Sequence, residues 1–191
     1  MDVPANPTRR LTPEQILEQA RQLIGVETEP IEALYPIEYE PIRRYCHAAG
    51  DSNPLFLDPD YARSTAYGAV LCPPLALRAV TMLPGEPLDN PFPEPPPDLP
   101  LLPEIPGGRR MSMNLEVEWE FFAPVRVGDR ISETSRYADF FFKPIKIDPK
   151  AIGYVTERIY RNQQQTVVAI SRTTSMIHRT PEEVRAAGDA V

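Results

Sequence analysis

The stretch from residue 45 to residue 74 holds the densest group of side chains that could do chemistry. Asp51 and Asn53 lie two positions apart in a run of turn-forming residues that continues with Pro54. A carboxylate held near a substrate can transfer a proton, and an amide beside it can orient a water molecule. The same residue types are also typical of a plain turn between two helices. Both interpretations stay open on the residues alone.

Other reactive groups are few, because the chain has two histidines and two cysteines. His47 lies on the polar face of a predicted helix, which favours exposure to solvent, and His178 lies at the end of a predicted strand. Cys46 falls on the apolar face of the same helix, which predicts a buried thiol. Cys72 precedes an apolar helix and could face a pocket, but no neighbour would activate it. The cysteines predict neither a disulfide framework nor a zinc site.

The composition is that of a globular domain with an excess of proline. Of 191 residues, 42% are hydrophobic and 25% charged, and the 24 prolines are about twice the average share. This excludes an all-helical bundle and predicts long loops. The net charge of −7 argues against nucleic acid as a partner, because phosphate binding needs a basic surface. No apolar run is long enough for a membrane span, and no secretory signal is visible, so we expect a reduced, cytoplasmic protein.

Hydrophobic periodicity predicts short helices in the first half of the chain. The first expected element is a helix over 13–24, capped by Thr12 and stopped by Gly25. An edge strand over 33–39, interrupted by Pro36, and a helix over 41–49, closed by Gly50, should follow. The last two are a helix that begins at Pro59 with Asp58 as its cap and a buried helix over 75–83.

The second half predicts an antiparallel sheet. The clearest strand covers 111–122, where apolar residues alternate with Asn114 and three glutamates. One face of this strand should therefore lie in the core and the other should be exposed to solvent. Further strands are expected over 130–142, 151–161 and 166–177, with a hairpin turn at 162–164. We expect a four-stranded meander around one buried helix, which is an α+β fold. Such a layer leaves one sheet edge and one sheet face exposed, so we expect a dimer that covers them. The polar tail from Thr180 should fray.

A proline-rich stretch separates the two halves, with ten prolines in residues 84–106. Helix and central strand are excluded there, so we expect an insertion that wraps the surface. The predicted organisation is a helical extension over 1–30, one domain over 31–180 that contains a proline-rich loop over 84–110, and a tail over 181–191.

In the 45–74 segment the sequence resembles the MaoC-like hydratases and dehydratases of the hotdog fold. The family signature is Gly-Asp-x-Asn-Pro-Leu-His-x-Asp-Pro followed by Tyr-Ala or Phe-Ala. The positions that match in register are Gly50, Asp51, Asn53, Pro54, Leu55, Asp58, Pro59, Tyr61 and Ala62. Residues 119–129 also resemble the family, with an aromatic strand, a proline and then Gly-Asp. The resemblance covers about 33–180 and implies a single hotdog domain, an antiparallel sheet wrapped around a central helix.

The resemblance implies addition of water to a trans-2-enoyl thioester, or its removal from a 3-hydroxyacyl thioester, with no cofactor beyond the thioester substrate. In the family an Asp and a His hold the water, and a backbone N–H at the start of the central helix polarises the carbonyl. Asp51 and Asn53 are therefore candidate catalytic residues. However, Phe56 stands at the histidine position and cannot transfer a proton, and Pro74 stands at the glycine position and has no N–H.

Phe56 and the Cys72-Pro73-Pro74 run resemble the N-terminal, fatty-acid-synthase-like half of double-hotdog dehydratases, which is not catalytic. This implies a partner hotdog chain that supplies an Asp–His dyad, while the present chain shapes the acyl pocket for a coenzyme A or acyl-carrier thioester. Candidate substrate contacts are Phe56, Tyr67, Cys72, Leu75, Arg109 and Arg110. The pair Arg43-Arg44 is a second candidate phosphate clamp. Phe140, Phe141 and Phe142 could line the pocket or belong to the core.

Three functions remain possible from the sequence. The first is a subunit of a heteromeric enoyl-thioester hydratase or 3-hydroxyacyl-thioester dehydratase. The second is a self-sufficient homodimeric hydratase that uses Asp51, and the third is a thioester-binding protein without catalysis. The acyl group (fatty, aromatic or steroid-derived), the carrier and the net direction of the reaction stay open.

Overall fold

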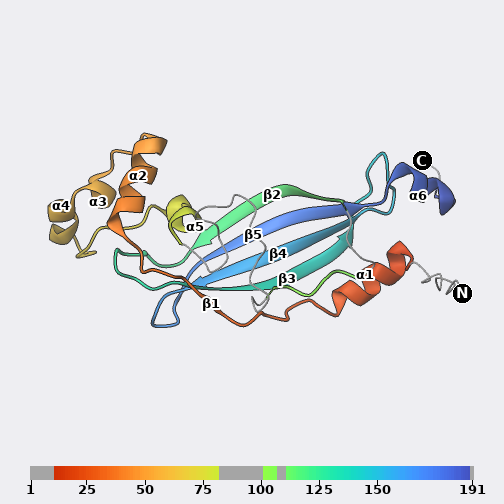
Figure 1. The fold of residues 1–191 in the computed structure, drawn as a ribbon, viewed down its shortest axis with the longest axis horizontal. Helices are drawn as coiled ribbons and strands as arrows, with labels where there is room; N and C mark the ends of the chain where they lie inside the picture. Colours follow the sequence, from red (N-terminus) through yellow and green to blue (C-terminus); the bar gives the residue numbers. More distant parts are fainter. Residues whose placement is uncertain (1–10, 82–100, 107–110, 190–191) are drawn as a thin grey trace, which may run out of the picture.

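The computed structural model describes residues 11–81, 101–106 and 111–189, which form one antiparallel five-stranded sheet with helices at both ends (Figure 1). The helices α2 (Tyr39–Ala49), α3 (Pro54–Leu57) and α4 (Pro59–Ser64) lie beyond one end of the sheet. The helices α1 (Pro13–Arg21) and α6 (Pro181–Ala186) lie at the other end. The signature segment, residues 50–62, therefore lies at the opposite end of the sheet from α1 and α6.

The strand order in the sheet is β1-β3-β4-β5-β2. The strands are β1 (Ile31–Glu32), β2 (Met111–Phe121), β3 (Ser132–Phe142), β4 (Ile152–Arg161) and β5 (Val167–His178). The predicted hairpins from β3 to β5 are confirmed, but the four-stranded meander is wrong because β2 pairs with β5 rather than β3. The connection from β2 to β3 crosses the end of the sheet instead. It is held there by hydrogen bonds from Cys72 N to Val125 O and from Gly128 N to Ile37 O, both 2.8 Å.

Strand β2 forms one edge of the sheet, and its predicted alternation is present from Glu116 to Phe121, whereas an irregularity between Asn114 and Glu116 shifts the register and places Met113 on the same face as the glutamates. Val117, Trp119 and Phe121 share a face, and three glutamates share the other. The predicted burial of the apolar face is wrong for a single chain, because 54% of Val117 and 40% of Phe121 are exposed. An edge strand has a neighbouring strand on one side only, so its apolar side chains become buried only through contacts with another part of the chain or with a second chain.

The opposite edge of the sheet is covered by the chain itself. Gly25 N donates to Tyr137 O and Thr28 N donates to Ser135 O, both over 2.9 Å, and the short β1 then pairs with β3. The strand predicted over 33–39 is therefore wrong. Pairing occurs two residues earlier, at 31–32, where no proline interrupts the N–H ladder.

Helix α1 begins as predicted, with a capping box between Thr12 and Gln15, but it ends at Arg21 rather than residue 24. Its buried face packs against Tyr137 and Phe140 of β3. Phe140 is fully buried in this second cluster, which confirms the core interpretation for this residue.

The predicted fraying after Thr180 is wrong. The chain forms α6, in which Thr180 and Glu183 make a second capping box. Val184 on this helix is 3% exposed. A satisfied N-terminus and a buried anchor are enough to order a short helix at the end of a chain.

At the other end of the sheet, Gly50 closes α2 in the left-handed region with φ of 69°, and Asp58 caps α4, as predicted. The helix predicted over 75–83 is shorter in the described residues: a 3-10 turn over Pro74–Ala76 and then α5 (Leu77–Val80). Residues 82–83 lie outside the described part. So does the proline-rich loop except for 101–106, where Leu102 and Ile105 pack against the α1 cluster.

The first hydrophobic cluster joins the signature segment to the sheet. Ile42 and Cys46 of α2, Leu77 of α5 and Tyr160 of β4 are all buried in it. In the part of the chain that the structure describes, no helix is long and apolar enough to cross a bilayer.

Candidate functional site

An apolar pocket of about 290 Å³ lies where the start of α5 meets the end of β2. Its lining residues come from three segments, and they are Tyr67, Cys72, Pro73, Pro74, Leu77, Phe121, Phe122, Ala123, Pro124 and Val125. The hydrogen bond from Cys72 N to Val125 O joins two of its walls. Tyr67 and Cys72 are sequence-predicted substrate contacts that the structure brings together. Phe121 and Phe122 were missed as site residues, although two aromatic side chains before Ala-Pro at a strand end are a signal for such a wall.

Cys72 is a wall of the pocket rather than a nucleophile. Its side chain is 6% exposed, and burial, together with the nearby Cys46, raises the pKa of the thiol to about 12. The Sγ atom lies 3.4 Å from Pro73 O, to which it donates. A thiol with this pKa stays protonated near neutral pH and behaves as a small apolar group.

Pro74 lies in the pocket wall at the first position of the 3-10 turn. It has no N–H, so the backbone at this position cannot donate to a thioester carbonyl. The sequence-predicted contact Leu75 follows it, but its side chain is 63% exposed and is not in the lining. The geometry therefore supports a packing surface at the start of α5.

The polar side chains of the signature segment cap backbone groups. Asp51 Oδ1 accepts a hydrogen bond from Asn53 N at 2.9 Å, and Asn53 Oδ1 accepts one from Leu55 N at 3.0 Å. Phe56 is partly buried against the first hydrophobic cluster. None of Asp51, Asn53 and Phe56 lines the apolar pocket.

Neither histidine reaches the pocket. His47 is exposed on α2 as predicted. His178 lies at the far end of β5, where its Nδ1 is 2.9 Å from Arg179 O. Within the described ranges, no group of three or more His, Cys, Asp and Glu side chains is placed to hold a metal ion.

The two candidate arginine pairs have different outcomes. Arg43 and Arg44 both bond to Glu40, over 2.7 and 3.0 Å. These hydrogen bonds lower the pKa of Glu40 to about 2, so the carboxylate stays charged near neutral pH and offsets one of the two positive charges. Arg43 and Arg44 thus share Glu40 as a partner, and a phosphate clamp at this pair stays a prediction. Arg109 and Arg110 lie outside the described residues.

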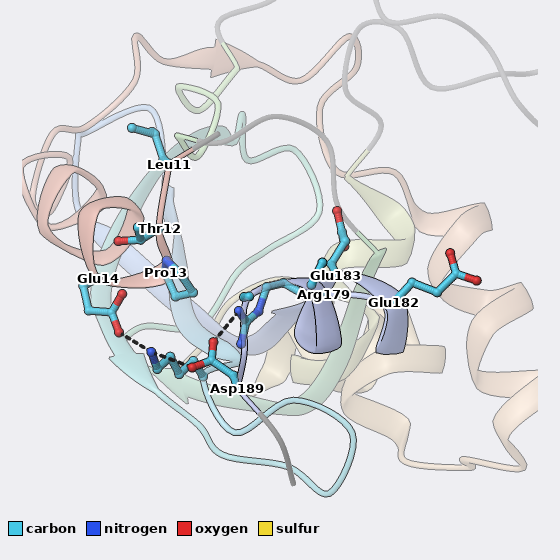
Figure 2. A pocket seen from close by; sticks show the side chains of 11 residues that line it. Leu11, Thr12, Pro13, Glu14, Arg179, Glu182, Glu183 and Asp189 are labelled. Carbon is cyan, nitrogen blue, oxygen red and sulfur yellow. Dashed lines mark hydrogen bonds and ion pairs between the residues drawn. The ribbon is translucent and has the colours of Figure 1, made fainter. Parts of the chain in front are cut away.

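A second cavity, of about 560 Å³, lies between α1 and α6 (Figure 2). Its walls carry charged side chains from both helices and from the β3–β4 loop, including Glu14, Lys150, Arg179 and Asp189. It lies at the opposite end of the sheet from the signature segment.

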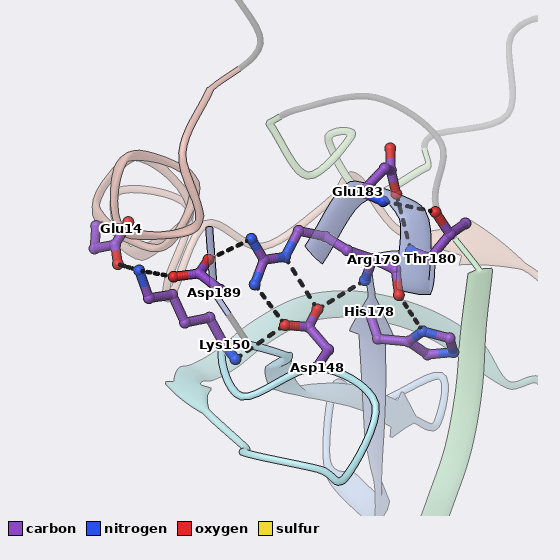
Figure 3. A network of polar contacts seen from close by, with 8 residues as sticks. All are labelled: Glu14, Asp148, Lys150, His178, Arg179, Thr180, Glu183 and Asp189. Carbon is purple, nitrogen blue, oxygen red and sulfur yellow. Dashed lines mark hydrogen bonds and ion pairs between the residues drawn. The ribbon is translucent and has the colours of Figure 1, made fainter. Parts of the chain in front are cut away.

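One network of ion pairs joins Glu14, Lys150, Asp189 and Arg179 of this second cavity (Figure 3). Asp148, fully buried, binds Arg179 through Oδ1 and Nη2 at 2.7 Å, and Asp189 binds Arg179 Nη1 at 2.7 Å. Lys150 then bridges Asp189 and Glu14 over 2.9 Å each. Burial alone would raise the pKa of Asp148, but the hydrogen bonds from Arg179 outweigh it and hold this pKa below its usual value. The network links α1, the β3–β4 loop and the residues around α6, so its role is to hold these elements together.

Comparison with known proteins places these features in a family. Residues 22–171 match the family model described as FAS1-like, dehydratase domain region. The chain is 32% identical over 149 residues to a probable enoyl-CoA hydratase alpha subunit from Thermomonospora curvata, covering 75% of this chain and 46% of that protein. The chain spans about half the length of the curated relatives it matches first.

Solved structures show the fold. The ChsH1-ChsH2 complex from Mycobacterium tuberculosis contains a chain that matches with a TM-score of 0.69 and 19% identity, covering 87% of this chain and 98% of that one. A MaoC-like dehydratase from Rhodospirillum rubrum matches with a TM-score of 0.54 and 20% identity over 81% of this chain and 93% of that one. With a sheet of this kind and a family model that spans most of the sequence, the chain is a hotdog protein and belongs to the FAS1-like branch of the MaoC-like dehydratases.

Proposed function

We propose that this chain is one subunit of a heteromeric enoyl-thioester hydratase or 3-hydroxyacyl-thioester dehydratase. Its own part is to form the acyl pocket between α5 and β2. A second hotdog chain supplies the Asp–His dyad that handles water and proton. The substrate is an acyl group on coenzyme A or on an acyl-carrier protein.

The observation that carries this proposal is the chemistry of the apolar pocket. Among the described residues that line it there is no carboxylate and no imidazole, and its thiol has a pKa of about 12. Hydration of an enoyl thioester needs a group that can transfer a proton at the reaction pH. The pocket can bind an acyl chain, but the acid and base have to come from elsewhere.

The size of the pocket fits an acyl chain. A volume of about 290 Å³ corresponds to roughly ten groups of water size, at about 30 Å³ each. Aromatic and aliphatic walls favour burial of methylene groups, at about 0.8 kcal/mol for each one that leaves water. These properties suit the tail of the substrate rather than its reacting carbons.

The arrangement of the sheet supports a second subunit. One edge is covered by residues 24–33, whereas β2 at the other edge exposes an apolar face directly beside the pocket. The related proteins point the same way, since one solved relative is a complex of two named components and one curated relative is called an alpha subunit.

The test is an assay of hydration with enoyl-CoA substrates of short, long and aromatic acyl groups. The chain is measured alone and after co-expression with a hotdog chain from the same source that carries the Asp–His motif. We expect turnover in the ordinary enzyme range, about 1–10³ s⁻¹, only in the pair. The same rate with the chain alone would favour the self-sufficient hydratase that uses Asp51. Binding without turnover in either sample would favour the thioester-binding protein.

A further inference from the structure

In the part of the chain that the structure describes, three buried side-chain oxygens have no hydrogen-bond partner, and they are Thr81 Oγ1, Glu133 Oε2 and Tyr160 OH. The three residues are 2%, 5% and 0% exposed. Buried polar atoms are hydrogen-bonded in nearly all native structures, because a buried atom without a partner costs free energy. Atoms that depart from this rule at one place indicate a site for a polar group.

Glu133 and Tyr160 are direct neighbours across β3 and β4, so their side chains lie on the same face of the sheet. Arg158 Nε lies 3.7 Å from Glu133 Oε1, which is longer than the usual charge-assisted hydrogen bond of about 2.8 Å. The positive charge of Arg158 makes the buried carboxylate tolerable at this position. Glu133 Oε2 keeps its capacity to accept a hydrogen bond.

The hydroxyl of Tyr160 keeps its proton. Burial, and then the charge of the nearby Glu133, raises the pKa of Tyr160 well above its usual value, although Arg158 and Arg78 act in the opposite direction. A protonated phenol can both donate and accept a hydrogen bond, whereas a carboxylate can only accept. The pair therefore suits a group that donates one hydrogen bond and accepts another.

A hydroxyl group meets this requirement, because its proton can go to Glu133 Oε2 while its oxygen accepts from Tyr160 OH. A carbonyl oxygen has no proton to donate to Glu133. An ammonium group is disfavoured by the nearby positive charges of Arg78 and Arg158.

One row of side chains across the sheet joins this pair to the acyl pocket. Phe121 in the pocket wall pairs with Ala169 of β5, and Ala169 pairs with Tyr160. Neighbouring strands are about 4.8 Å apart, so Tyr160 lies about 10 Å from Phe121 along this row. The ring of Trp119 stacks on both Phe121 and Tyr160, at 5.6 Å between centroids. An acyl chain that passes Leu77, which lines the pocket and packs in the same cluster as Tyr160, therefore brings its far end to the pair.

We propose that Glu133 and Tyr160 bind a hydroxyl group at the far end of the acyl chain. The hydroxyl donates to Glu133 Oε2 and accepts from Tyr160 OH, so one ligand group gives both buried atoms a partner. The preferred substrate is then an acyl thioester with a hydroxyl group distant from the thioester. That the hydroxyl belongs to an acyl thioester rests on the proposed function, whereas the choice of a hydroxyl rests on the two side chains.

The test compares matched ligands that cannot react. Calorimetric titration of the full chain, alone and in the two-chain complex, gives the dissociation constants of saturated acyl-CoA thioesters with 8, 10, 12 and 14 carbons. Each length is used with and without a hydroxyl group on the last carbon. We expect one length at which the hydroxyl tightens binding about tenfold, the gain from a buried hydrogen bond to a charged group, and no gain at the shortest length.

Two matched variants assign the effect to Tyr160. Tyr160→Phe keeps the ring and should abolish the preference for the hydroxyl, while plain thioesters bind as they do to the wild type. Its melting temperature without ligand should not fall, because Tyr160 OH has no partner to lose. Tyr154→Phe is the control, since Tyr154 OH lies 3.0 Å from Ser112 Oγ. This variant should melt about 2–4 °C lower than the wild type and keep the preference.

Equal dissociation constants for hydroxylated and plain thioesters at every length would overturn the hydroxyl site, and so would a preference that survives Tyr160→Phe. A fall in melting temperature for Tyr160→Phe as large as that for Tyr154→Phe would show that Tyr160 OH already has a partner, which also overturns it. Because plain thioesters are the reference, these failures leave the hydratase assignment intact. Absence of binding by every thioester would contradict the proposed function itself.

Discussion

The carboxylate of Asp51 accepts a hydrogen bond from the backbone N–H of Asn53 at 2.9 Å, within the segment where the family's catalytic residues are found. The amide of Asn53 is used in the same way, on Leu55 N. These two polar side chains of the signature thus hold the turn between α2 and α3. These hydrogen bonds give both side chains a role in the fold that does not require proton transfer.

The cap at Asn53 makes a prediction about stability. Asn53→Ala removes the acceptor for Leu55 N and should lower the free energy of unfolding by about 1 kcal/mol, as for other N-caps. In a chain of this size the melting temperature should fall by about 2–4 °C. Asn53→Asp keeps an acceptor and serves as the control. Equal melting temperatures for Asn53→Ala and the wild type would show that the cap contributes nothing.

Tyr67 tests the acyl pocket. Tyr67→Ala removes an aromatic wall and should lower kcat/KM of the two-chain enzyme about tenfold for long acyl groups, while a four-carbon substrate that does not reach the wall is unaffected. Tyr61→Ala is the matched control, because Tyr61 is similarly exposed, at 47% against 43%, and is not in the lining. A uniform loss for both substrates would place the acyl chain elsewhere.

The cysteines should be inert in the folded chain. Burial raises the pKa of Cys72 to about 12, and burial together with the charge of Asp51 raises that of Cys46. Because the thiolate is the species that reacts, alkylation by iodoacetamide at pH 8 should be slow until denaturant is added. Mass spectrometry of the time course measures this. Fast labelling of Cys72 in the native protein would show an activated thiol in the pocket.

The buried ion pair of Asp148 with Arg179 should dominate the acid sensitivity of the fold. Hydrogen bonds from Arg179 and Lys150 lower the pKa of Asp189, and those from Arg179 outweigh burial to lower that of Asp148. The unfolded chain therefore binds more protons, so the stabilisation is complete above the unfolded pKa of about 4 and is lost as the pH falls through the lower folded values.

Asp148→Asn should therefore cost about 3–5 kcal/mol at pH 7, because it leaves a buried guanidinium short of a partner, and should flatten the loss of stability on acidification. Urea unfolding at pH 7 and pH 3.5 measures both effects. Asp60→Asn removes an exposed pair with Arg63 and should leave the melting temperature unchanged. The same acid sensitivity in Asp148→Asn and wild type would contradict the role given to this pair.

Local signals in the sequence predicted much of the fold. The caps at Thr12 and Asp58, the left-handed Gly50 and the strands β3 to β5 all follow from residues that are close together in the chain. Helix α6 also has such a signal, since Thr180 and Glu183 have capping-box spacing, but its polar composition suggested fraying.

Long-range relationships were not predictable in this way. Alternation showed that residues 111–121 form a strand, but it carries no information on the neighbour, and β2 joined β5 rather than β3. Asp148 and Arg179 are 31 positions apart, so only the fold brings them together. Likewise, Tyr67 and Cys72 meet Phe121 in one pocket only because residues 122–131 cross the end of the sheet.

The most direct test of the division of labour is Asp51→Asn in the two-chain enzyme. Asparagine keeps an oxygen that can accept from Asn53 N but cannot transfer a proton. The account predicts kcat within about twofold of the wild type, while the same change in the partner's aspartate costs about 10²–10⁴-fold, the usual contribution of general acid–base catalysis. A loss of that size from Asp51→Asn, with the melting temperature unchanged, would contradict the account and make this chain the catalytic subunit.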